Sequence, residues 1–320
     1  MSAMTYRQLG ESGLTVSTVG LGCNQIGGTL DLEATRAVVD AAIDVGVSLF
    51  DTADIYGNEP GASERLLGQA LEGRRDRVVL ATKFGMDMQG TTLPGYEARG
   101  SRRYIKASVE GSLTRLRTDH IDLYQMHMPD VRTPIEETLD ALDELVREGK
   151  VRYLGSSKFT GWQVVDADWA ARSSGGARFI SAQNEYSLLE RGAESEVIPA
   201  AEHVGVGLIP FFPLARGLLS GKYRRGAAAP AGTRLAGNPG FLDRANWDVV
   251  EDLQKFADAR ELSLLDVAIG GLAAQPAVSS IIVGATKPEQ VRANAAAGGW
   301  EPTAADLVEL DQITSGPSST

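Results

Sequence analysis

The stretch Leu49-Phe50-Asp51-Thr52-Ala53-Asp54-Ile55-Tyr56-Gly57 decides how this 320-residue sequence is interpreted. Its first residues continue an apolar run that begins at Val47, and a short run of this kind is typical of a buried strand. Asp51 ends the run, and Tyr56 follows within a turn. A buried carboxyl group needs a partner, and a phenol with its ordinary pKa near ~10 needs a neighbour that shifts this value before it exchanges protons readily at neutral pH. The stretch therefore predicts a strand end that carries proton chemistry.

The same alternation of strand and helix patterns continues along the chain and predicts the fold. Strand-like apolar runs cover residues 19–22, 47–50, 78–82, 121–125, 151–155, 179–183, 206–210 and 280–283. Helix-like segments cover residues 32–45, 62–71, 102–116, 134–147, 161–171, 194–203, 246–259 and 288–297. Eight such units indicate parallel βα repeats, and a closed (β/α)8 barrel of ~250 residues plus insertions suits the length. A doubly wound open sheet is the alternative, but residues 19–24 contain only two of the three glycines of a dinucleotide-binding turn.

Several local features complete the predicted single domain of residues 1–320. Residues 5–16 form a hairpin pattern, and a further helix is expected at residues 263–274. Thr133 is expected to cap the helix that begins at Pro134, with Glu136 closing a capping box. Two long connections, residues 84–101 and 211–245, follow strands and therefore belong at the face of the barrel that carries active sites. We expect a disordered tail at residues 314–320.

Composition excludes several classes of function. Lys and Arg number 31 against 42 Asp and Glu, and the net charge of −11 argues against nucleic-acid and anionic-membrane partners. The single cysteine, Cys23, forms no intrachain disulfide, and three histidines with one cysteine are little material for a zinc site. No run approaches the ~20 apolar residues of a membrane span, and the first residues lack the apolar core of a signal peptide. We expect a cytoplasmic protein without a metal.

Four side chains are expected to meet at one rim of the barrel. Asp51 with Tyr56, then Lys83, then His127 follow three consecutive strands, which are neighbours in a barrel. Pairing Lys83 with Asp51 keeps both charged when buried, and the ammonium is expected to pull the Tyr56 pKa down toward neutrality. His127 offers a second hydrogen bond to the same oxygen. Such a group protonates a carbonyl oxygen but supplies no electrons, so a hydride donor is required. Each residue also has a structural alternative, as a helix cap, a solvated charge or a buried histidine.

These residues lie in motifs that resemble the aldo-keto reductase superfamily from about residue 6 to residue 313. The motifs are residues 50–57, 81–83, 122–130, 150–157, 213–222 and 284–290. The resemblance implies a (β/α)8 barrel that binds NADP(H), with NAD(H) as the alternative, without a Rossmann fold. It implies that Tyr56 is the proton donor, that Lys83 and Asp51 tune it, and that His127 orients the carbonyl.

The resemblance also implies a cofactor site. Ser157 and Gln183 would bind the nicotinamide carboxamide, and Phe211 would stack on the ring. The residues assigned to the cofactor are Gly22, Asn24, Asp51, Ser157, Lys158, Gln183, Phe211, Pro213, Leu214, Gly217, Lys222, Arg234, Gly284, Thr286, Lys287, Gln290 and Asn294. Lys158 stands where many members have Asn or Arg, Gln290 replaces an Arg and Ala293 a common Glu. Lys287 and Arg234 are therefore the candidate partners of a 2′-phosphate.

Three functions are compatible with these residues. An NADPH-dependent carbonyl reductase acting on a small carbonyl or alcohol is the leading hypothesis. An NADPH-sensing protein is the second, since channel β-subunits share this fold and cofactor. A retaining glycosidase is the third: Glu185 follows a strand, with Asp51 or Asp130 as its partner, although such an acid pair belongs after an earlier strand. The substrate and the oligomeric state are not encoded in a readable motif.

Overall fold

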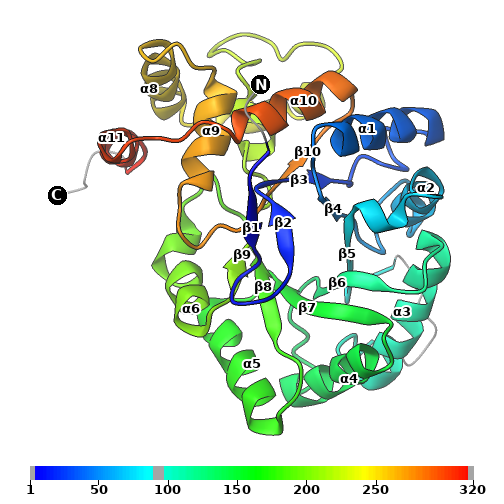
Figure 1. Cartoon of the computed structure of the whole chain (residues 1–320). Helices are drawn as coiled ribbons and strands as arrows, with labels where there is room; N and C mark the ends of the chain where they lie inside the picture. Colours follow the sequence, from blue (N-terminus) through cyan, green and yellow to red (C-terminus); the bar gives the residue numbers. More distant parts are fainter. Residues whose placement is uncertain (1–3, 89–96, 316–320) are drawn as a thin grey trace.

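Eight parallel strands form one closed sheet at the centre of the molecule (Figure 1), in a computed structural model that describes residues 4–88 and 97–315. The strands are β3 (Val19–Gly22), β4 (Leu49–Asp51), β5 (Val79–Phe84), β6 (Ile121–Met126), β7 (Val151–Ser157), β8 (Phe179–Gln183), β9 (Gly207–Leu208) and β10 (Ile281–Gly284). Their order is β10-β3-β4-β5-β6-β7-β8-β9. The ring closes where the Ile282 amide donates to the Pro210 carbonyl oxygen at 3.2 Å, and the predicted (β/α)8 barrel is confirmed.

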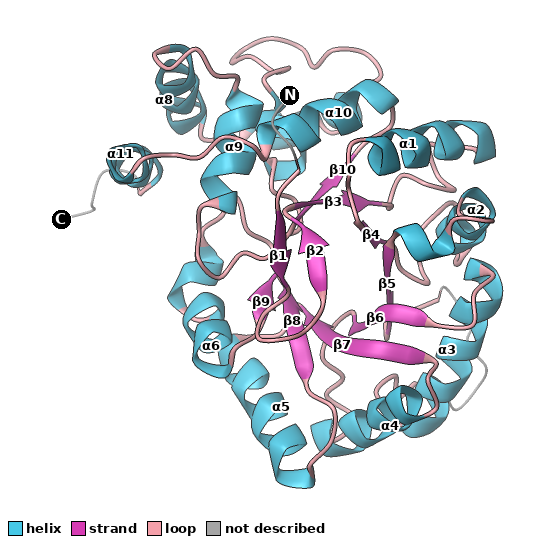
Figure 2. Cartoon of the chain, in the orientation of Figure 1, coloured by secondary structure: helices cyan, strands magenta, loops and turns pink. Residues whose placement is uncertain are grey.

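Helices surround the strands, as Figure 2 shows in cyan around magenta. The helices of the repeat are α1 (Leu32–Asp44), α2 (Ala62–Ala70), α3 (Arg102–Leu116), α4 (Ile135–Arg147), α5 (Gly161–Ser174), α6 (Val197–Val204), α9 (Leu264–Ala273) and α10 (Pro288–Ala297). The additional helices are α7 (Pro239–Asp243), α8 (Trp247–Asp258) and α11 (Ala304–Thr314). The expected repeat helix at residues 246–259 is therefore wrong in its role: α9 packs against β10 and α10, and α8 lies outside it, against α9 and α11. Short 3₁₀ turns are η1 (Arg75–Arg77), η2 (Gly192–Ser195), η3 (Ala215–Ser220) and η4 (Arg234–Gly237). The periodic segments therefore predicted most of these helices to within a few residues.

A small hairpin closes the end of the barrel that faces the viewer in Figure 1. Its strands β1 (Tyr6–Gln8) and β2 (Thr15–Ser17) pair antiparallel, as the sequence predicted. Leu9 and Val16 are fully buried, and they belong to the same apolar cluster as the side chains that fill the barrel interior. These interior side chains are Leu49, Ala81, Leu123, Ile209 and Ile282. The hairpin thus closes this end of the barrel with apolar contacts.

The predicted cap of α4 is wrong. The helix begins at Ile135, and Pro134 takes the capping position with an extended backbone, φ −54° and ψ 141°. The Thr133 hydroxyl instead donates to Asp130 Oδ2 at 2.7 Å, within the preceding loop. The capping pattern does not consider this carboxylate. Because Asp130 binds the Thr133 hydroxyl, Thr133 does not cap the helix and Glu136 has no partner for a capping box.

Helix α11 was not predicted from the sequence. Thr303 caps it in a capping box with Asp306, and this Thr-x-x-Asp spacing was the signal that could have revealed it. The helix includes Thr314, and Ser315 is its C-cap, so the expected disordered tail at residues 314–320 is wrong for its first two residues. Residues 316–320 lie outside the described part of the chain.

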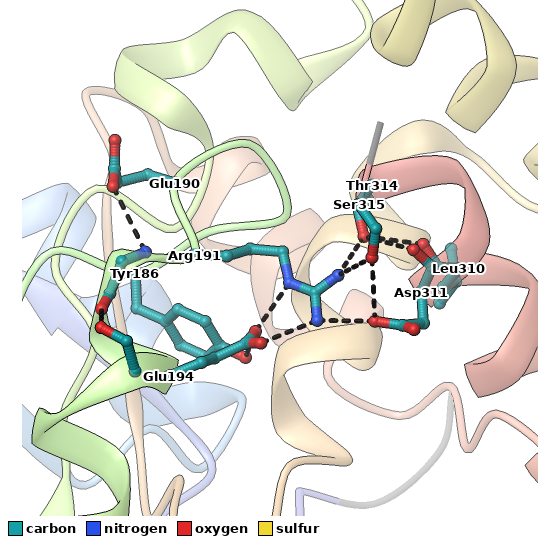
Figure 3. A network of polar contacts seen from close by, with 10 residues as sticks. Tyr186, Glu190, Arg191, Glu194, Leu310, Asp311, Thr314 and Ser315 are labelled. Carbon is teal, nitrogen blue, oxygen red and sulfur yellow. Dashed lines mark hydrogen bonds and ion pairs between the residues drawn. The ribbon is translucent and has the colours of Figure 1, made fainter. Parts of the chain in front are cut away.

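One arginine joins α11 to the loop after β8 (Figure 3). The Arg191 guanidinium donates to both carboxylate oxygens of Glu194, at 2.8 and 2.7 Å, and to Asp311 Oδ1 at 2.7 Å. A further bond of 2.7 Å reaches the hydroxyl of Thr314. This side chain, which comes from the loop after β8, therefore anchors the end of the described chain to the barrel.

Candidate functional site

Three adjacent strands each carry an apolar residue on the inner face of the barrel, followed two positions later by a polar one. Side chains alternate along a strand, so residues two apart share a face. Leu49 and Asp51 on β4 share one face, as do Ala81 and Lys83 on β5. Leu123 and Gln125 do the same on β6, where Gln125 pairs in register with Lys83. The apolar members fill the interior, and the polar members lie one layer above them, toward the carboxyl ends of the strands.

Lys83 is the centre of this polar layer, and its side chain has no exposed surface. Its Nζ donates to Asp51 Oδ2 at 2.5 Å, to the carbonyl oxygen of Thr52 at 2.9 Å and to Tyr56 Oη at 3.4 Å. Burial acts to lower the pKa of Lys83, but Asp51 and Tyr56 outweigh burial and raise it. The lysine is therefore an ammonium ion that joins the carboxylate to the phenol. Sequence reasoning placed Asp51 and Lys83 just past their strands; both lie within the strands.

Two amides hold the other oxygen of Asp51. Gln125 Nε2 and Gln183 Nε2 donate to Asp51 Oδ1 at 2.9 and 3.0 Å, and Gln183 also donates to Gln125 Oε1 at 3.1 Å. Sequence reasoning missed Gln125, which is fully buried inside β6. Its spacing of two residues before His127, on the same face of the strand, was the available signal. These bonds fix the carboxylate so that its second oxygen faces Lys83.

The expected lowering of the Tyr56 pKa toward neutrality is wrong. Burial raises the pKa of Tyr56, Lys83 lowers it and Asp51 raises it, and the net direction is upward from 10. The reason is that Lys83 lies closer to the Asp51 carboxylate, at 2.5 Å, than to the phenol oxygen, at 3.4 Å, so its charge is largely compensated. Tyr56 is consequently protonated at neutral pH and is available as a proton donor.

His127 completes the group as a neutral ring. The residue is 4% exposed, and its ring meets the Tyr56 ring edge-on with centroids 5.8 Å apart. Burial, together with the charges of Lys83 and Lys158, lowers the pKa of His127 to about 2. Its Nδ1 is buried without a hydrogen-bond partner among the described residues. A neutral imidazole beside Tyr56 is suited to orienting a polar ligand.

This pKa predicts a specific loss of stability in acid. An unfolded histidine has a pKa near ~6.5. Below this pH the histidine is protonated in the unfolded chain, whereas His127 in the folded protein stays unprotonated. Its contribution to stability is therefore complete above pH ~6.5 and falls as the pH drops toward 2. Between pH ~6.5 and ~5 the loss amounts to roughly 2 kcal/mol. Urea unfolding measures the free energy of unfolding at pH ~7.5 and ~5.0. The decrease in this free energy between the two pH values should be smaller for His127→Gln than for the wild type, by about this amount. The control His203→Gln, on the exposed end of α6, should behave like the wild type; an equal loss in all three proteins would contradict the assignment.

A cavity of about 1250 Å³ opens above Tyr56 and His127. The expected cofactor residues all line it: Gly22, Asn24, Asp51, Ser157, Lys158, Gln183, Phe211, Pro213, Leu214, Gly217, Lys222, Arg234, Gly284, Thr286, Lys287, Gln290 and Asn294. Lys83 does not line the cavity; it lies beneath its floor. The volume exceeds the roughly 300–1,000 Å³ of pockets for single small ligands, and is large enough for a dinucleotide beside a second molecule. That these residues bind a cofactor stays a prediction.

The loop after β9 reaches this cavity through a contorted backbone. Phe212, Ala215 and Arg216 have positive φ angles of 54°, 45° and 59°, a conformation that is rare for residues with side chains. The guanidinium groups of Arg216 and Arg234 lie 4.3 and 5.0 Å from the centre of the Phe212 ring. Backbone of this kind persists only where its surroundings hold it, and it concentrates at ligand sites.

Two polar side chains in the cavity wall, Gln290 and Ser157, differ in their hydrogen bonding in a way the sequence did not reveal. Gln290 Oε1 accepts hydrogen bonds from the Thr286 amide at 2.7 Å and its hydroxyl at 3.1 Å, and so closes the turn before α10. The Ser157 hydroxyl, in contrast, is buried without a hydrogen-bond partner among the described residues. A buried hydroxyl in this state is open to a hydrogen bond with a water or a polar ligand group in the cavity.

The geometry does not favour the glycosidase hypothesis. Asp51 is committed to Lys83 and two amides, and Asp130 accepts bonds from the Gly100 and Arg132 amides and the Thr133 hydroxyl. Glu185 lines the cavity and lies 3.8 Å from Arg216. The residues proposed to pair with Glu185 therefore already have structural partners.

Metal ligands do not gather anywhere in the described chain. Across residues 4–88 and 97–315 there is no cluster of three or more His, Cys, Asp or Glu arranged to hold a metal ion. No helix in these ranges has both the length and the apolar character needed to cross a bilayer.

The fold and the site define the class of (β/α)8-barrel oxidoreductases. The model of the aldo/keto reductase family matches residues 18–315, and the chain belongs to this family. It is 40% identical to the uncharacterized oxidoreductase YrpG of Bacillus subtilis (strain 168), over 90% of this chain and 89% of that protein. It is 37% identical to a probable voltage-gated potassium channel subunit beta of Oryza sativa subsp. japonica, over 91% and 90%. It is 34% identical to the L-glyceraldehyde 3-phosphate reductase of Escherichia coli (strain K12), over 97% and 92%.

Family membership makes the protein an oxidoreductase of the aldo-keto reductase type. Members of the family generally use NAD(P)H, and membership implies a small carbonyl substrate. The resemblance seen in the motifs is thereby confirmed.

Proposed function

We propose that this protein is a single-domain, NADPH-dependent carbonyl reductase in which Tyr56 is the proton donor. One observation carries the proposal: an ammonium ion, Lys83, joins a fixed carboxylate to a protonated phenol at the floor of a large cavity. The catalytic residues are Tyr56, Lys83, Asp51 and His127. No arrangement of this kind is needed for packing, because apolar side chains of similar volume would fill the same space without buried charges to compensate.

In the proposed mechanism the chain moves one proton. When bound, NADPH supplies the hydride that reduces the carbonyl carbon. Neutral His127 donates a hydrogen bond that orients the carbonyl oxygen beside Tyr56, and Tyr56 Oη gives its proton to that oxygen. Lys83 stabilises the phenolate that remains, because its ammonium lies 3.4 Å from Oη. Asp51, held by Gln125 and Gln183, keeps Lys83 charged and in place.

The cavity residues fit NADP(H). We infer that the unsatisfied Ser157 hydroxyl binds the nicotinamide carboxamide. Gln183, whose Nε2 is engaged with Asp51 and Gln125, would contribute its side-chain oxygen, and Phe211 also lines the cavity. The cations Lys222, Arg234 and Lys287 supply positive charge for the phosphates. Lys287 immediately precedes α10, where the helix N-terminus also attracts an anion. We therefore infer a preference for NADPH over NADH, with NADH as the weaker alternative.

A spectrophotometric assay tests the proposal. The protein is mixed with NADPH and 4-nitrobenzaldehyde, and NADPH oxidation is followed at increasing aldehyde concentration. Saturable oxidation with equimolar alcohol formation supports a reductase. The likeness to a channel subunit supplies the second candidate, an NADPH-binding sensor. A sensor would bind NADPH in a direct titration but oxidise it no faster than the uncatalysed rate with any aldehyde or ketone.

Closure of the loop at residues 211–245 over the cofactor is a further expected result. Lys222, Arg234 and Phe211 of this loop line the cavity, while Arg224 and Arg225 are exposed to trypsin. Bound NADPH should tie the loop to the barrel and slow its cleavage severalfold, since a protease needs a locally unfolded substrate. Mass spectrometry of limited tryptic digests measures the cleavage rates. Identical rates with and without NADPH would show that the loop does not close over the cofactor.

A further inference from the structure

Lys158 occupies a special position in the cavity. It follows β7 directly, and its backbone has a positive φ of 59°. Its amide donates to the Gln183 carbonyl oxygen at 3.0 Å, which ties this turn to the end of β8. A left-handed lysine is uncommon, and such residues concentrate where a side chain must be aimed at a ligand. The turn places Lys158 in the cavity wall together with Tyr56, Met86 and His127.

The ammonium of Lys158 has no carboxylate partner within ion-pair distance among the described residues. Nζ contacts the Met86 sulfur at 4.0 Å, and a thioether does not compensate a charge. Glu185 acts on Lys158 from farther away, but Arg216 lies within 3.8 Å of that carboxylate. Lys83, the other cation near Tyr56, is already paired with Asp51. Within the described chain, the reacting end of the cavity therefore carries an uncompensated positive charge.

The resemblance also assigns Lys158 to the proposed cofactor, whose carboxamide oxygen can accept a hydrogen bond from the ammonium, but a neutral carboxamide does not compensate the charge. The cofactor phosphates belong beside Lys222, Arg234 and Lys287, on the segments after β9 and β10. In the proposed binding mode the part of the cofactor near Ser157 would be the neutral carboxamide, which needs hydrogen bonds rather than an ion. Burial and the repulsion of Lys83 lower the pKa of Lys158, so an unoccupied ammonium here is unfavourable. An anion bound beside Lys158 would relieve both effects.

We propose that Lys158 selects carbonyl substrates that carry a carboxylate or a phosphate group close to the reacting carbonyl. The inference rests on the proposed reductase function and narrows its substrate class. The anionic group would accept charge-assisted hydrogen bonds from Nζ, while the carbonyl oxygen lies against Tyr56 and His127. Such bonds are stronger than those between neutral groups, so the charge distinguishes an acid from its ester.

Matched substrate pairs test the proposal. The 2-, 3- and 4-formylbenzoates and their methyl esters differ in charge and in the distance from the carboxylate to the aldehyde. Glyceraldehyde 3-phosphate and glyceraldehyde form the phosphate arm. The wild type should show a kcat/KM about 10- to 100-fold higher for the anion in at least one pair. Lys158→Met should abolish this preference chiefly through a higher KM, and Lys158→Arg, which keeps the charge, should retain most of it.

Two results would overturn the inference. One is an anion-to-ester ratio that is the same in the wild type and in Lys158→Met for every pair. The other is a loss of NADPH affinity in Lys158→Met with the ratio unchanged, which would assign the lysine to the cofactor. If the wild type reduces no carbonyl at all, the proposed function fails, and binding of benzoate to the NADPH-loaded protein decides the anion site by calorimetry. Binding that is lost in Lys158→Met supports the site, and equal binding or no binding to the wild type removes it.

Discussion

Replacing Tyr56 with phenylalanine is expected to lower the turnover of NADPH and 4-nitrobenzaldehyde by at least about 10²-fold, with NADPH bound as in the wild type. The substitution removes only the hydroxyl that lies 3.4 Å from Lys83, so the ring can keep its edge-on contact with His127. The expected loss is in kcat, because the missing proton is needed only when the carbonyl oxygen gains negative charge. Steady-state kinetics and a fluorescence titration of NADPH measure the two quantities.

The matched control is Tyr6→Phe. This tyrosine is 51% exposed on the hairpin, and its hydroxyl donates to the Gly46 carbonyl oxygen at 2.8 Å, away from the cavity. The control should retain wild-type turnover. Wild-type turnover in Tyr56→Phe as well would remove Tyr56 from the proposed role, whatever the family resemblance implies.

Replacing Lys83 with methionine is expected to lower the free energy of unfolding by about 3–5 kcal/mol and to abolish turnover. Methionine fills a similar volume but leaves the Asp51 carboxylate buried without its counter-ion, and that side chain is only 4% exposed. Losing one partner of a buried pair is costly because the remaining charge is unpaired. Urea unfolding at pH ~7 measures the change.

The double variant Lys83→Met/Asp51→Asn separates the charge from the packing. It leaves no ion at either position, and the side-chain carbonyl oxygen that Asp51→Asn retains can still accept from the Gln125 and Gln183 amides. Most of the lost stability should therefore return while turnover remains absent. A double variant as unstable as Lys83→Met would show that methionine disturbs packing rather than electrostatics. Recovery of stability without activity is what a functional ion pair predicts.

The sequence predicted the barrel and the neighbourhood of the site because both follow from local patterns. Apolar runs that alternate with amphipathic segments permit few other folds, and strand ends in a barrel share one rim. These two rules are enough to bring Asp51, Lys83 and His127 together. The prediction was less good at boundaries: Asp51 and Lys83 lie inside their strands, and Gln125 was overlooked because a polar residue within a strand looks like part of the strand.

The errors concern quantities that depend on three-dimensional surroundings. The direction of the Tyr56 pKa follows from the balance between burial and a lysine shared with Asp51, and neither quantity is encoded in spacing. Thr133 does not cap α4 because its hydroxyl is hydrogen-bonded to Asp130, which the preceding loop brings close to it. The substrate is equally hidden, because the shape of the pocket depends on how side chains such as Met86 and Phe212 pack around Tyr56, and spacing does not encode this packing.

The complete enclosure of Lys83 has a consequence for the durability of the proposed enzyme. Aldehydes condense with unprotonated amines to give imines, so a catalyst that turns over aldehydes risks modification of its own lysines. Lys83 lies below the floor of the cavity, has no accessible surface, and carries a proton that Asp51 and Tyr56 make harder to remove. The ammonium of Lys83 can therefore stabilise charge on Tyr56 Oη, 3.4 Å away, while its nitrogen stays protonated and inaccessible to aldehydes in the cavity.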